Sequence, residues 1–406
     1  MTGAGQQVEA VIQDVAYGGR AVARLDGMVC FVAGALPGET VLIEITRAHR
    51  QFAEGRLRRV LTPAADRQEP ACPLALGVAG PGLACPGCCY QHAAYDAEVR
   101  IKAGQFRDLL ARAAGGDPAV CLAPVTAPEP LAYRNKMVLH AQKDGAATRL
   151  GYYLEDNTTV LDVPACPLAM PPLNDLLGER RGHPGFLAGL GDGMPVTFRY
   201  TSRDGALWWR GRSSEKDTWL VEASRLGSIA VPRGSFYQMN PAVSERLLAR
   251  IIALLAEQPP AAVIDLYCGV GVFALAAAQV APAVTGIDSD GPAIQAAEYN
   301  ARQHSRTNIR WMAGTAAKAL AELDRAAPGT TLIADPPRAG LGRAAVRQIA
   351  RLRPDRLIYV SCAADTLARD AAWLKEGGYG VKRAQLFDMF PRTAHFESVT
   401  ELACGA

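Results

Sequence analysis

Hydrophobic and polar residues alternate over five short runs near the start of the chain. The runs are rich in β-branched residues and separated by turns at Gly18-Gly19, Gly27 and Pro37-Gly38; they are VEAVIQDVA, GRAVARL, MVCFVAGAL, TVLIEITRA and FAEGRLRRVL. This pattern predicts short strands. Five such strands in one small unit predict a closed, OB-like β-barrel over residues 1–65. The segment TPAADRQEP that follows has the composition of a linker.

From Pro241 onward, apolar strand patterns alternate regularly with amphipathic helix patterns. The strands are AAVIDLY, AVTGID, TLIAD and RLIYVS, and the helices include AVSERLLARIIALLAE and AAVRQIARL. This alternation predicts βαβ units and a mainly parallel sheet over residues 236–406. Ligands of such sheets bind outside the carboxyl ends of the strands, so we expect the chemistry there.

The stretch between these two parts has a mixed pattern. A helix is predicted over residues 93–113, and residues 133–231 are rich in strand patterns with turns at Lys143-Asp144-Gly145 and Arg203-Asp204-Gly205. We therefore expect a central α+β domain over residues 66–235.

Composition places the chain among globular proteins but leaves its partner open. Of 406 residues, 49% are hydrophobic and 20% charged, which excludes disorder as the main state. The net charge of +3 neither demands nor excludes nucleic acid. Five arginines nevertheless stand between Arg47 and Val60 with one acid, Glu54. The chain begins with no secretory signal pattern and has no apolar span, so we expect a soluble, cytoplasmic protein.

The first strand of the C-terminal part runs into a glycine loop, Gly269-Val270-Gly271-Val272-Phe273-Ala274. Taken alone, this G-x-G-x-x-A pattern is weak, and it also matches a nicotinamide-binding loop. Asp265 precedes the loop, where a carboxylate repels a pyrophosphate but suits a ligand with an amino group and a sulfonium. S-adenosylmethionine is such a ligand. Asp288 closes the next strand, at a position where acids accept hydrogen bonds from ribose hydroxyls.

Two later strands also end in residues able to do chemistry. The fourth ends in Asp335-Pro336-Pro337, where the prolines predict a stiff extended loop behind a carboxylate that faces the pocket. The fifth ends in Cys362, ahead of a helix that Asp365 is expected to cap. There the helix dipole favours the thiolate. Near the end of the chain, His395 and Glu397 are candidate acid–base groups.

Four of the ten cysteines crowd into 18 residues. Without an export signal, metal ligation or thiol chemistry is expected rather than disulfides. The candidate ligands have the form C-x12-C-x2-C…C and are Cys72, Cys85, Cys88 and Cys166. Both zinc and an iron–sulfur cluster satisfy this set, and Cys89 is a possible substitute for Cys88.

Together these residues resemble the S-adenosylmethionine-dependent RNA uracil-5-methyltransferases, which form 5-methyluridine in ribosomal and transfer RNA. The motifs that carry the resemblance are DPPRAGL, YVSC…TLARD and DMFPRTAHFES. The resemblance covers essentially the whole chain. It implies an α/β fold: a C-terminal class I, Rossmann-like methyltransferase domain, the central α+β domain, and an N-terminal RNA-binding barrel of the TRAM type. It also implies a [4Fe-4S] cluster at the four cysteines.

Carried over by position, the resemblance makes Cys362 the nucleophile and Glu397 the general base. The matching cofactor-pocket positions are Gln238, Tyr267, Val272, Asp288, Thr315 and Asp335. The chain departs from the family where Val272 replaces a common Asn and where Ala363-Ala364 replaces Asn-Pro. Thr315 aligns poorly, and the spacing between Cys72 and Cys85 is longer than usual.

The implied reaction begins with attack of Cys362 on carbon 6 of uracil, after which carbon 5 takes the methyl group and Glu397 removes the carbon-5 proton. The substrate is expected to be RNA, with 23S ribosomal RNA favoured over transfer RNA, and the protein a monomer without an obligate protein partner. The rival functions are an amine N-methyltransferase using Asp335-Pro336-Pro337, a non-catalytic RNA-binding or iron–sulfur sensor protein, and a nicotinamide-dependent oxidoreductase.

Overall fold

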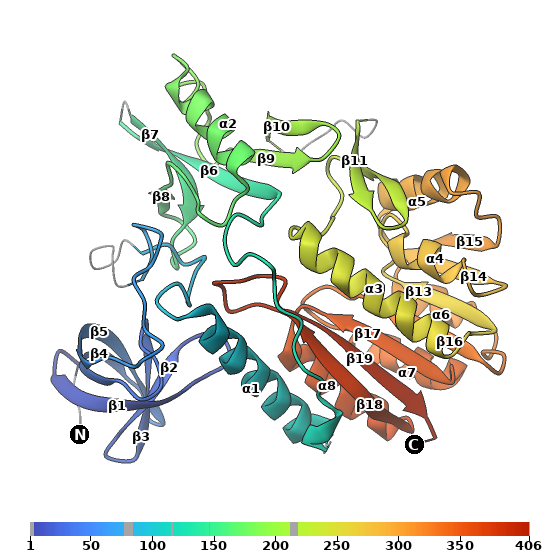
Figure 1. Cartoon of the computed structure of the whole chain (residues 1–406), viewed down its shortest axis with the longest axis horizontal. Coiled ribbons are helices and arrows are strands. Elements are labelled where there is room, and N and C mark those ends of the chain that lie inside the picture. Colours follow the sequence, from blue (N-terminus) through green and yellow to red (C-terminus); the bar gives the residue numbers. More distant parts are fainter. Residues whose placement is uncertain (1–3, 77–83, 115–116, 146, 212–217, 406) are drawn as a thin grey trace.

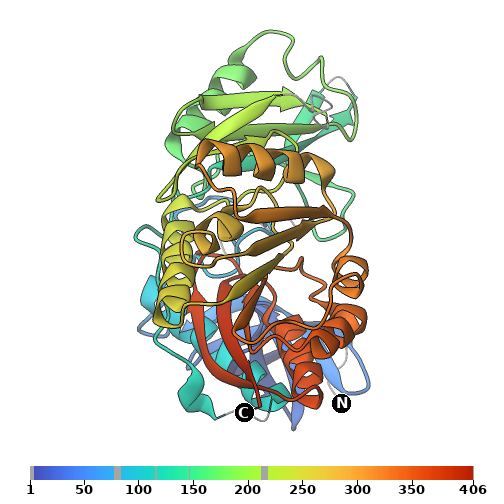
Figure 2. The ribbon, with the colours of Figure 1, turned by 90° about the vertical axis from the view of Figure 1, so that its right-hand side faces the viewer.

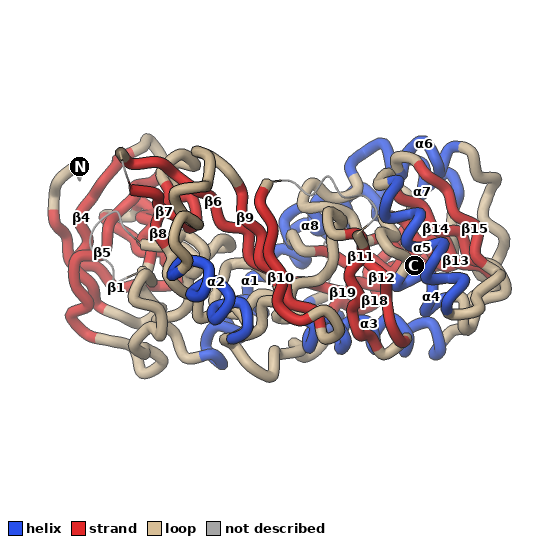
Figure 3. Tube along the Cα trace, turned by 90° about the horizontal axis from the view of Figure 1, so that it is seen from above, coloured by secondary structure: helices blue, strands red, loops and turns tan. Residues whose placement is uncertain are grey.

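The computed structural model describes residues 4–76, 84–114, 117–145, 147–211 and 218–405 (Figure 1). An N-terminal barrel lies at one end of the molecule and a seven-stranded sheet at the other, as the view from above shows (Figure 3). None of the helices in these ranges has the length and apolar character needed to cross a membrane.

The N-terminal strands close into a barrel in the order β1-β2-β3-β5-β4, which confirms the predicted OB-like unit. The strands are β1 (Gln7–Val15), β2 (Ala21–Leu25), β3 (Met28–Ala33), β4 (Thr40–Ala48) and β5 (Phe52–Thr62). Alternate residues, among them Ile12, Val32 and Ile43, point inward and are fully buried. At Gly55 of β5, a Cβ would come within 2.3 Å of Ile43, so glycine is needed for the barrel to close.

Helix α1 (Tyr95–Ala114) packs against α8 (Ala364–Glu376) of the C-terminal part. After η1 (Pro118–Val120), bridges at Cys121 and Val125 continue this contact along the edge of the sheet. A segment within the predicted central range thus lies on the C-terminal part (Figure 1). The domain limits 1–65, 66–235 and 236–406 stay a prediction.

The central part is built on a five-stranded antiparallel sheet with the order β10-β9-β6-β7-β8, and α2 (Pro171–Gly182) packs on it. Its strands are β6 (Lys136–Asp144), β7 (Ala147–Tyr153), β8 (Val160–Asp162), β9 (Pro195–Thr201) and β10 (Gly205–Arg210). The turns predicted around Asp144 and Asp204 join β6 to β7 and β9 to β10. A separate hairpin, β11 (Trp219–Ser224) and β12 (Gly227–Pro232), packs on α5 (Gly291–Gln303) of the C-terminal part.

The C-terminal sheet has the order β15-β14-β13-β16-β17-β19-β18, with helices on both faces (Figure 2). Its first five strands are parallel, and β19 pairs antiparallel with both β17 and β18. The strands are β13 (Ala262–Leu266), β14 (Val284–Asp288), β15 (Ile309–Ala313), β16 (Thr330–Ala334), β17 (Arg356–Ser361), β18 (Tyr379–Phe387) and β19 (Glu397–Cys404). The helices are α3 (Pro241–Glu257), α4 (Val272–Ala277), α5 (Gly291–Gln303), α6 (Ala316–Ala321) and α7 (Gly342–Leu352), with α8. The predicted α/β class is confirmed.

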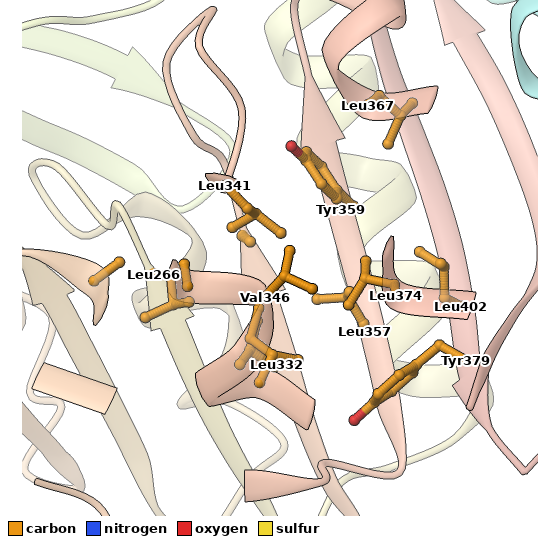
Figure 4. Close-up of a cluster of buried hydrophobic side chains, with 14 of the residues drawn as sticks. Leu266, Leu332, Leu341, Val346, Leu357, Tyr359, Leu367, Leu374, Tyr379 and Leu402 are labelled. Atoms are coloured by element: carbon orange, nitrogen blue, oxygen red, sulfur yellow. The ribbon is translucent and has the colours of Figure 1, made fainter. Parts of the chain in front are cut away.

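Apolar side chains cover both faces of this sheet. On one face, Leu332 and Leu357 of the central strands pack against Val346 of α7 and Leu374 of α8 (Figure 4). On the other face, a second cluster joins α3 and α4 to the same strands. Burial on both faces explains why the strand sequences read as nearly continuous apolar runs, and it leaves the strand ends as the accessible edge.

Candidate active site

The carboxyl ends of β13 to β17 meet at one edge of the sheet and bring most of the predicted site residues together. The strand order reverses between β13 and β16, which is where ligands of such sheets bind. Tyr267 follows β13, Asp288 closes β14, Thr315 follows β15, Asp335 follows β16 and Cys362 follows β17. Gln238 lies in the loop between β12 and α3.

The glycine loop after β13 has an unusual backbone. Tyr267, Gly269 and Gly271 all have positive φ, at 62°, 52° and 89°. A Cβ on Gly271 would lie 2.7 Å from Trp311, so backbone conformation and packing both require glycine there. The Asp288 carboxylate accepts the Gly269 N–H at 2.8 Å. This bond holds the loop against β14 and leaves lone pairs on Asp288 for a ligand hydroxyl.

Asp265 is fully buried, and neither of its carboxylate oxygens has a hydrogen-bond partner among the described residues. Burial, with Asp335 and Asp288 nearby, raises the pKa of this carboxyl well above its usual range. A buried unpaired carboxylate is costly, and a cationic ligand group removes the cost. The amino group and sulfonium of S-adenosylmethionine fit this need. The Gln238 side-chain oxygen is likewise buried without a partner.

Two of the predicted cofactor-pocket residues, Val272 and Thr315, have no side-chain hydrogen bond among the described residues that supports a polar contact with a ligand. Val272 is the first residue of α4 and packs against the apolar cluster of Val270 and Leu275. Its side chain therefore has no polar atom to replace the missing Asn. Thr315 is the exposed N-cap of α6, and its side chain makes no capping hydrogen bond.

Cys362 and Glu397 are brought together by the pairing of β17 with β19. Ser361 pairs with Ser398 in antiparallel register, and the Ser398 hydroxyl donates to the Ser361 carbonyl at 3.3 Å. Continued by one residue, this register sets Cys362 opposite Glu397. Residues opposite one another in an antiparallel pair project to the same face, so thiol and carboxyl share one side of the sheet.

Burial raises the pKa of the Cys362 thiol to about 11, and the nearby Glu397 and Asp335 add to the shift, while Arg338 opposes it. Burial and the two carboxyls thus oppose the thiolate that the position of Cys362 ahead of a helix was expected to favour. The expected cap is wrong. Ala363 is the N-cap of α8, and Asp365 lies in its first turn.

The acid–base candidates differ sharply. Glu397 is 3% exposed, with one unpartnered oxygen, and burial and Asp335 raise its pKa well above the usual range. Burial raises the pKa of Asp335 to about 7. Asp335 is therefore able to take up and release a proton near neutrality, and the pKa of the neighbouring Glu397 is shifted in the same direction. Burial instead lowers the pKa of His395 to about 4, so this imidazole is neutral.

Buried ion pairs hold the segment 388–396 that leads into Glu397. Lys102 of α1, which has no exposed surface, donates to Asp388 and to Glu98 at 2.7 Å each and to the Phe390 carbonyl at 3.2 Å. Arg392, with φ of 68°, donates from its backbone N–H to Glu98. Removing one partner of such a network leaves a buried charge unpaired, so the segment is firmly placed.

The cysteines of the predicted cluster site come from three segments and influence one another electrostatically. Burial raises the pKa of Cys72, Cys85 and Cys88, and neighbouring thiols, Cys166 in each case, add to the shift. Gln91 links the site by donating to the Cys88 sulfur at 3.3 Å and accepting the Cys72 N–H at 3.0 Å. Residues 77–83 of the intervening loop lie outside the described residues.

Within the described ranges, no three His, Cys, Asp or Glu side chains are arranged to hold one metal ion. A single zinc ion needs four ligands tightly around one point, whereas a cubane cluster takes each thiolate on a different iron. The four cysteines are therefore not arranged around a single ion in the part of the chain that the structure describes.

Ion pairs neutralise part of the positive charge of the arginine-rich stretch from Arg47 to Val60 on the barrel. Arg47 and Arg58 form ion pairs with Glu54 and Glu44. Arg50, Arg56 and Arg59 are exposed, and His49 stacks on Phe52 with ring centroids 4.3 Å apart. Exposed guanidinium groups beside an aromatic pair suit contacts to nucleic acid.

Two residues near the site were not predicted from the sequence. Arg338 stands three residues after Asp335, and its charge opposes the raised pKa values of both Cys362 and Glu397. Its place in the Asp-Pro-Pro motif was a usable signal. Tyr17 of the barrel accepts the Ala364 N–H at 3.1 Å. No local pattern links it to a helix almost 350 positions away.

Comparison with known proteins agrees with this geometry. Residues 224–403 match the family described as tRNA (Uracil-5-)-methyltransferase, and residues 3–57 match the TRAM domain. A protein of Pseudomonas putida named 23S rRNA (uracil(1939)-C(5))-methyltransferase RlmD is 31% identical over 97% of this chain and 93% of its own. The protein of that name from Pseudomonas savastanoi pv. phaseolicola is 32% identical over 98% and 94%.

The fold also matches a solved structure. The tRNA (uracil-54, C5)-methyltransferase of Pyrococcus abyssi, crystallised with S-adenosyl-L-homocysteine, covers 98% of this chain and 100% of its own with a TM-score of 0.73 and 21% identity. That identity supports the shared fold. The relatives at 31% and 32% identity, aligned over nearly their whole length, decide the family. The chain belongs to the S-adenosylmethionine-dependent RNA uracil-5-methyltransferases, the enzymes that methylate carbon 5 of a uridine in RNA.

Proposed function

We propose that the chain methylates a uridine of 23S ribosomal RNA, with Cys362 as nucleophile and Glu397 as general base. The relatives from the two Pseudomonas species carry that substrate in their names and align over more than nine-tenths of both chains. Transfer RNA is the alternative, because the family description and the similar solved structure name it. The observation that carries the mechanism is the register that sets Cys362 opposite Glu397.

The first step needs the Cys362 thiol to lose its proton. With a pKa near 11 it does so poorly alone, and the neighbouring Asp335 carboxyl would accept its proton, which leaves Glu397 free to take the carbon-5 proton later. The thiolate adds to carbon 6 of uracil, and the electron pair displaced from the 5,6 double bond makes carbon 5 nucleophilic. S-adenosylmethionine supplies the methyl group that carbon 5 takes.

The second step releases the product. A carboxylate at Glu397 removes the proton from carbon 5, the 5,6 double bond re-forms, and the Cys362 sulfur leaves carbon 6. Arg338 favours the charged forms of both side chains and so assists both proton transfers. The uracil has to be reached outside the stacked helix, so the substrate is a loop or a flipped-out nucleotide.

The cofactor pocket is divided among the strand ends. Asp265 would meet the amino group, Asp288 the ribose hydroxyls, and Gln238 a further polar group of S-adenosylmethionine. Tyr267 and Val272 would supply apolar contact, Thr315 would lie at the outer rim, and Asp335 would stand between cofactor and uracil.

The four cysteines Cys72, Cys85, Cys88 and Cys166 would hold a [4Fe-4S] cluster. The segment that carries Cys88 also braces the active site, because the backbone N–H groups of Cys89 and Tyr90 donate to the Arg392 carbonyl at 2.9 and 3.2 Å. A bound cluster would stabilise this brace and with it the approach to Glu397. We further expect a monomer that needs no protein partner.

Methyl transfer from labelled S-adenosylmethionine tests the function. Unmodified 23S ribosomal RNA and, separately, transfer RNA are incubated with wild-type protein and with Cys362→Ala. The expected result is 5-methyluridine in 23S ribosomal RNA with wild type alone. Label in transfer RNA alone would identify transfer RNA as the substrate in place of 23S ribosomal RNA. Label with both proteins would remove Cys362 from the chemistry and favour an amine N-methyltransferase.

A further inference from the structure

One aromatic side chain of the barrel reaches into the active site. Tyr17 lies in the loop between β1 and β2, yet its ring packs edge-on against Phe396, with centroids 6.1 Å apart and planes at 76°. Its hydroxyl oxygen accepts the N–H of Ala364 at 3.1 Å. Phe396 precedes Glu397, and Ala364 stands two residues after Cys362. Tyr17 therefore contacts both segments that carry the proposed catalytic pair.

The loop that carries Tyr17 is itself held firmly. Gln105 of α1 donates from its side-chain amide to the carbonyls of Val15 and Ala16 at 2.8 and 3.0 Å. Gly19, with φ of 87°, packs so closely on Cys89 that a Cβ would lie 2.6 Å from its sulfur. The loop is thus fixed between α1 and the cysteine segment.

The Tyr17 hydroxyl accepts a hydrogen bond from a backbone N–H, that of Ala364, which has no acceptor within its own helix. Ala364 is the first residue of α8 and is buried, and the first N–H groups of a helix find no acceptor inside it. The N-cap Ala363 has no side-chain acceptor to offer. Without Tyr17 the turn after Cys362 has to shift to expose this N–H to water.

We infer that Tyr17 is a positioning residue for the methyl-transfer reaction: through its bond to Ala364 and its contact with Phe396, the barrel sets the alignment of Cys362 with Glu397. The inference rests on the proposed roles of these two residues. It makes the RNA-binding barrel part of the active-site architecture as well as a docking module.

Steady-state kinetics with RNA test the inference. Tyr17→Phe keeps the ring on Phe396 and deletes only the acceptor, so kcat should fall about tenfold, while KM for RNA stays within about twofold. Tyr299→Phe is the matched control, because Tyr299 also packs edge-on, against Trp219, on the remote helix α5. An unchanged kcat in Tyr17→Phe, or a higher KM for RNA with unchanged kcat, would overturn the inference.

A double-mutant cycle identifies the bond. Ala364→Pro removes the N–H at a helix position that tolerates proline, and the preceding Ala363 is already extended. In that background Tyr17→Phe should cost less than about twofold in kcat. If Tyr17→Phe lowers kcat as much in the Ala364→Pro background as in the wild type, Tyr17 does not act through its hydrogen bond to Ala364. Should Ala364→Pro fail to fold, the kcat and KM split of Tyr17→Phe decides alone. Loss of the proposed chemistry is seen separately, as activity remaining in Cys362→Ala.

Discussion

Cys362 follows Ser361, the last residue of β17, and Glu397 precedes its partner Ser398 in β19, so the register continued by one residue sets Cys362 opposite Glu397. Thirty-four positions separate them in the chain, but the sheet places both side chains on one face. The β17–β19 ladder fixes the register as far as Ser361, and the hydrogen bond from Ala364 to Tyr17 holds the turn that carries Cys362. A nucleophile and a base held this way are poised for the two halves of one reaction.

Glu397→Gln should stop the reaction after methyl transfer. The amide cannot remove the carbon-5 proton, so the uracil stays bonded to the Cys362 sulfur. A denaturing gel with labelled RNA should show a slow-migrating protein–RNA species that also carries the methyl label. Adding Cys362→Ala to the same variant should abolish that species. Normal turnover by Glu397→Gln would assign the base elsewhere.

Substitutions of Glu397 and of Arg338 should shift the reactivity of Cys362 in opposite directions. In the ligand-free protein its alkylation by iodoacetamide should rise with pH towards about 11. Glu397→Gln removes a group that raises the thiol pKa, so the midpoint moves down. Arg338→Met removes one that lowers it, so the midpoint moves up. Mass spectrometry of the Cys362 peptide checks both, and shifts of the same sign would contradict the electrostatic account.

Asp265→Asn should weaken S-adenosylmethionine binding by more than about tenfold while stabilising the ligand-free protein at higher pH. A carboxyl whose pKa is raised on folding contributes stability below its unfolded pKa and loses it as pH rises through the folded value. The Tm advantage of the variant should therefore grow with pH.

Calorimetry and thermal melts between pH 5 and 9, with buffers matched, check this. Asp324→Asn is the control, because Asp324 is exposed and lies outside the candidate site. A Tm difference that stays flat with pH, or unchanged affinity for S-adenosylmethionine, would mean that Asp265 has another partner.

Gly271→Ala should destabilise the protein and impair cofactor binding. The positive φ costs an alanine about 1–3 kcal/mol before the contact with Trp311 is counted. Gly291→Ala is the matched control, since nothing lies within 4 Å of a Cβ there and φ is not positive. Urea unfolding of both variants measures the difference. Equal free energies of unfolding would show that the loop relaxes freely.

Cluster ligation should follow the four proposed cysteines. Cys85→Ser and Cys88→Ser should lose iron and sulfide in parallel after anaerobic purification, whereas Cys121→Ser should keep both. Cys89→Ser is the decisive variant, because Cys89 stands next to Cys88 in the chain while its sulfur lies close to Gly19 of the barrel. Retained iron in Cys88→Ser together with loss in Cys89→Ser would exchange the two assignments, and zinc in place of iron would refute the cluster.

Local sequence patterns predicted the strands and helices, because these depend mainly on residues that are close together in the chain. The strands of the barrel and the alternating strands and helices from Pro241 onward were predicted because burial repeats with a short period. The family motifs located Asp335, Cys362 and Glu397. The order β17-β19-β18 is a non-local choice, and only that order sets Cys362 opposite Glu397.

Electrostatics were the least predictable part. The sequence placed Cys362 before a helix, which favours thiolate, but its burial with Glu397 and Asp335 reverses the sign. The same holds for Lys102, a polar residue in a helix pattern that turns out to be wholly buried between Glu98 and Asp388. Such environments arise from segments that are distant in the chain, as Asp388 is from Lys102, and local patterns do not reveal them.

The position of β19 also constrains how the enzyme is assembled. Along the chain β19 comes after β18, yet in the sheet it lies between β17 and β18. β18 and β19 are consecutive strands that pair antiparallel, and it is β19 that pairs with β17, so direct pairing of β17 with β18 would exclude β19 from this position. Until β19 takes that place, Cys362 has no partner carboxyl from β19. The proposed catalytic pair is therefore complete only in a chain whose sheet is complete.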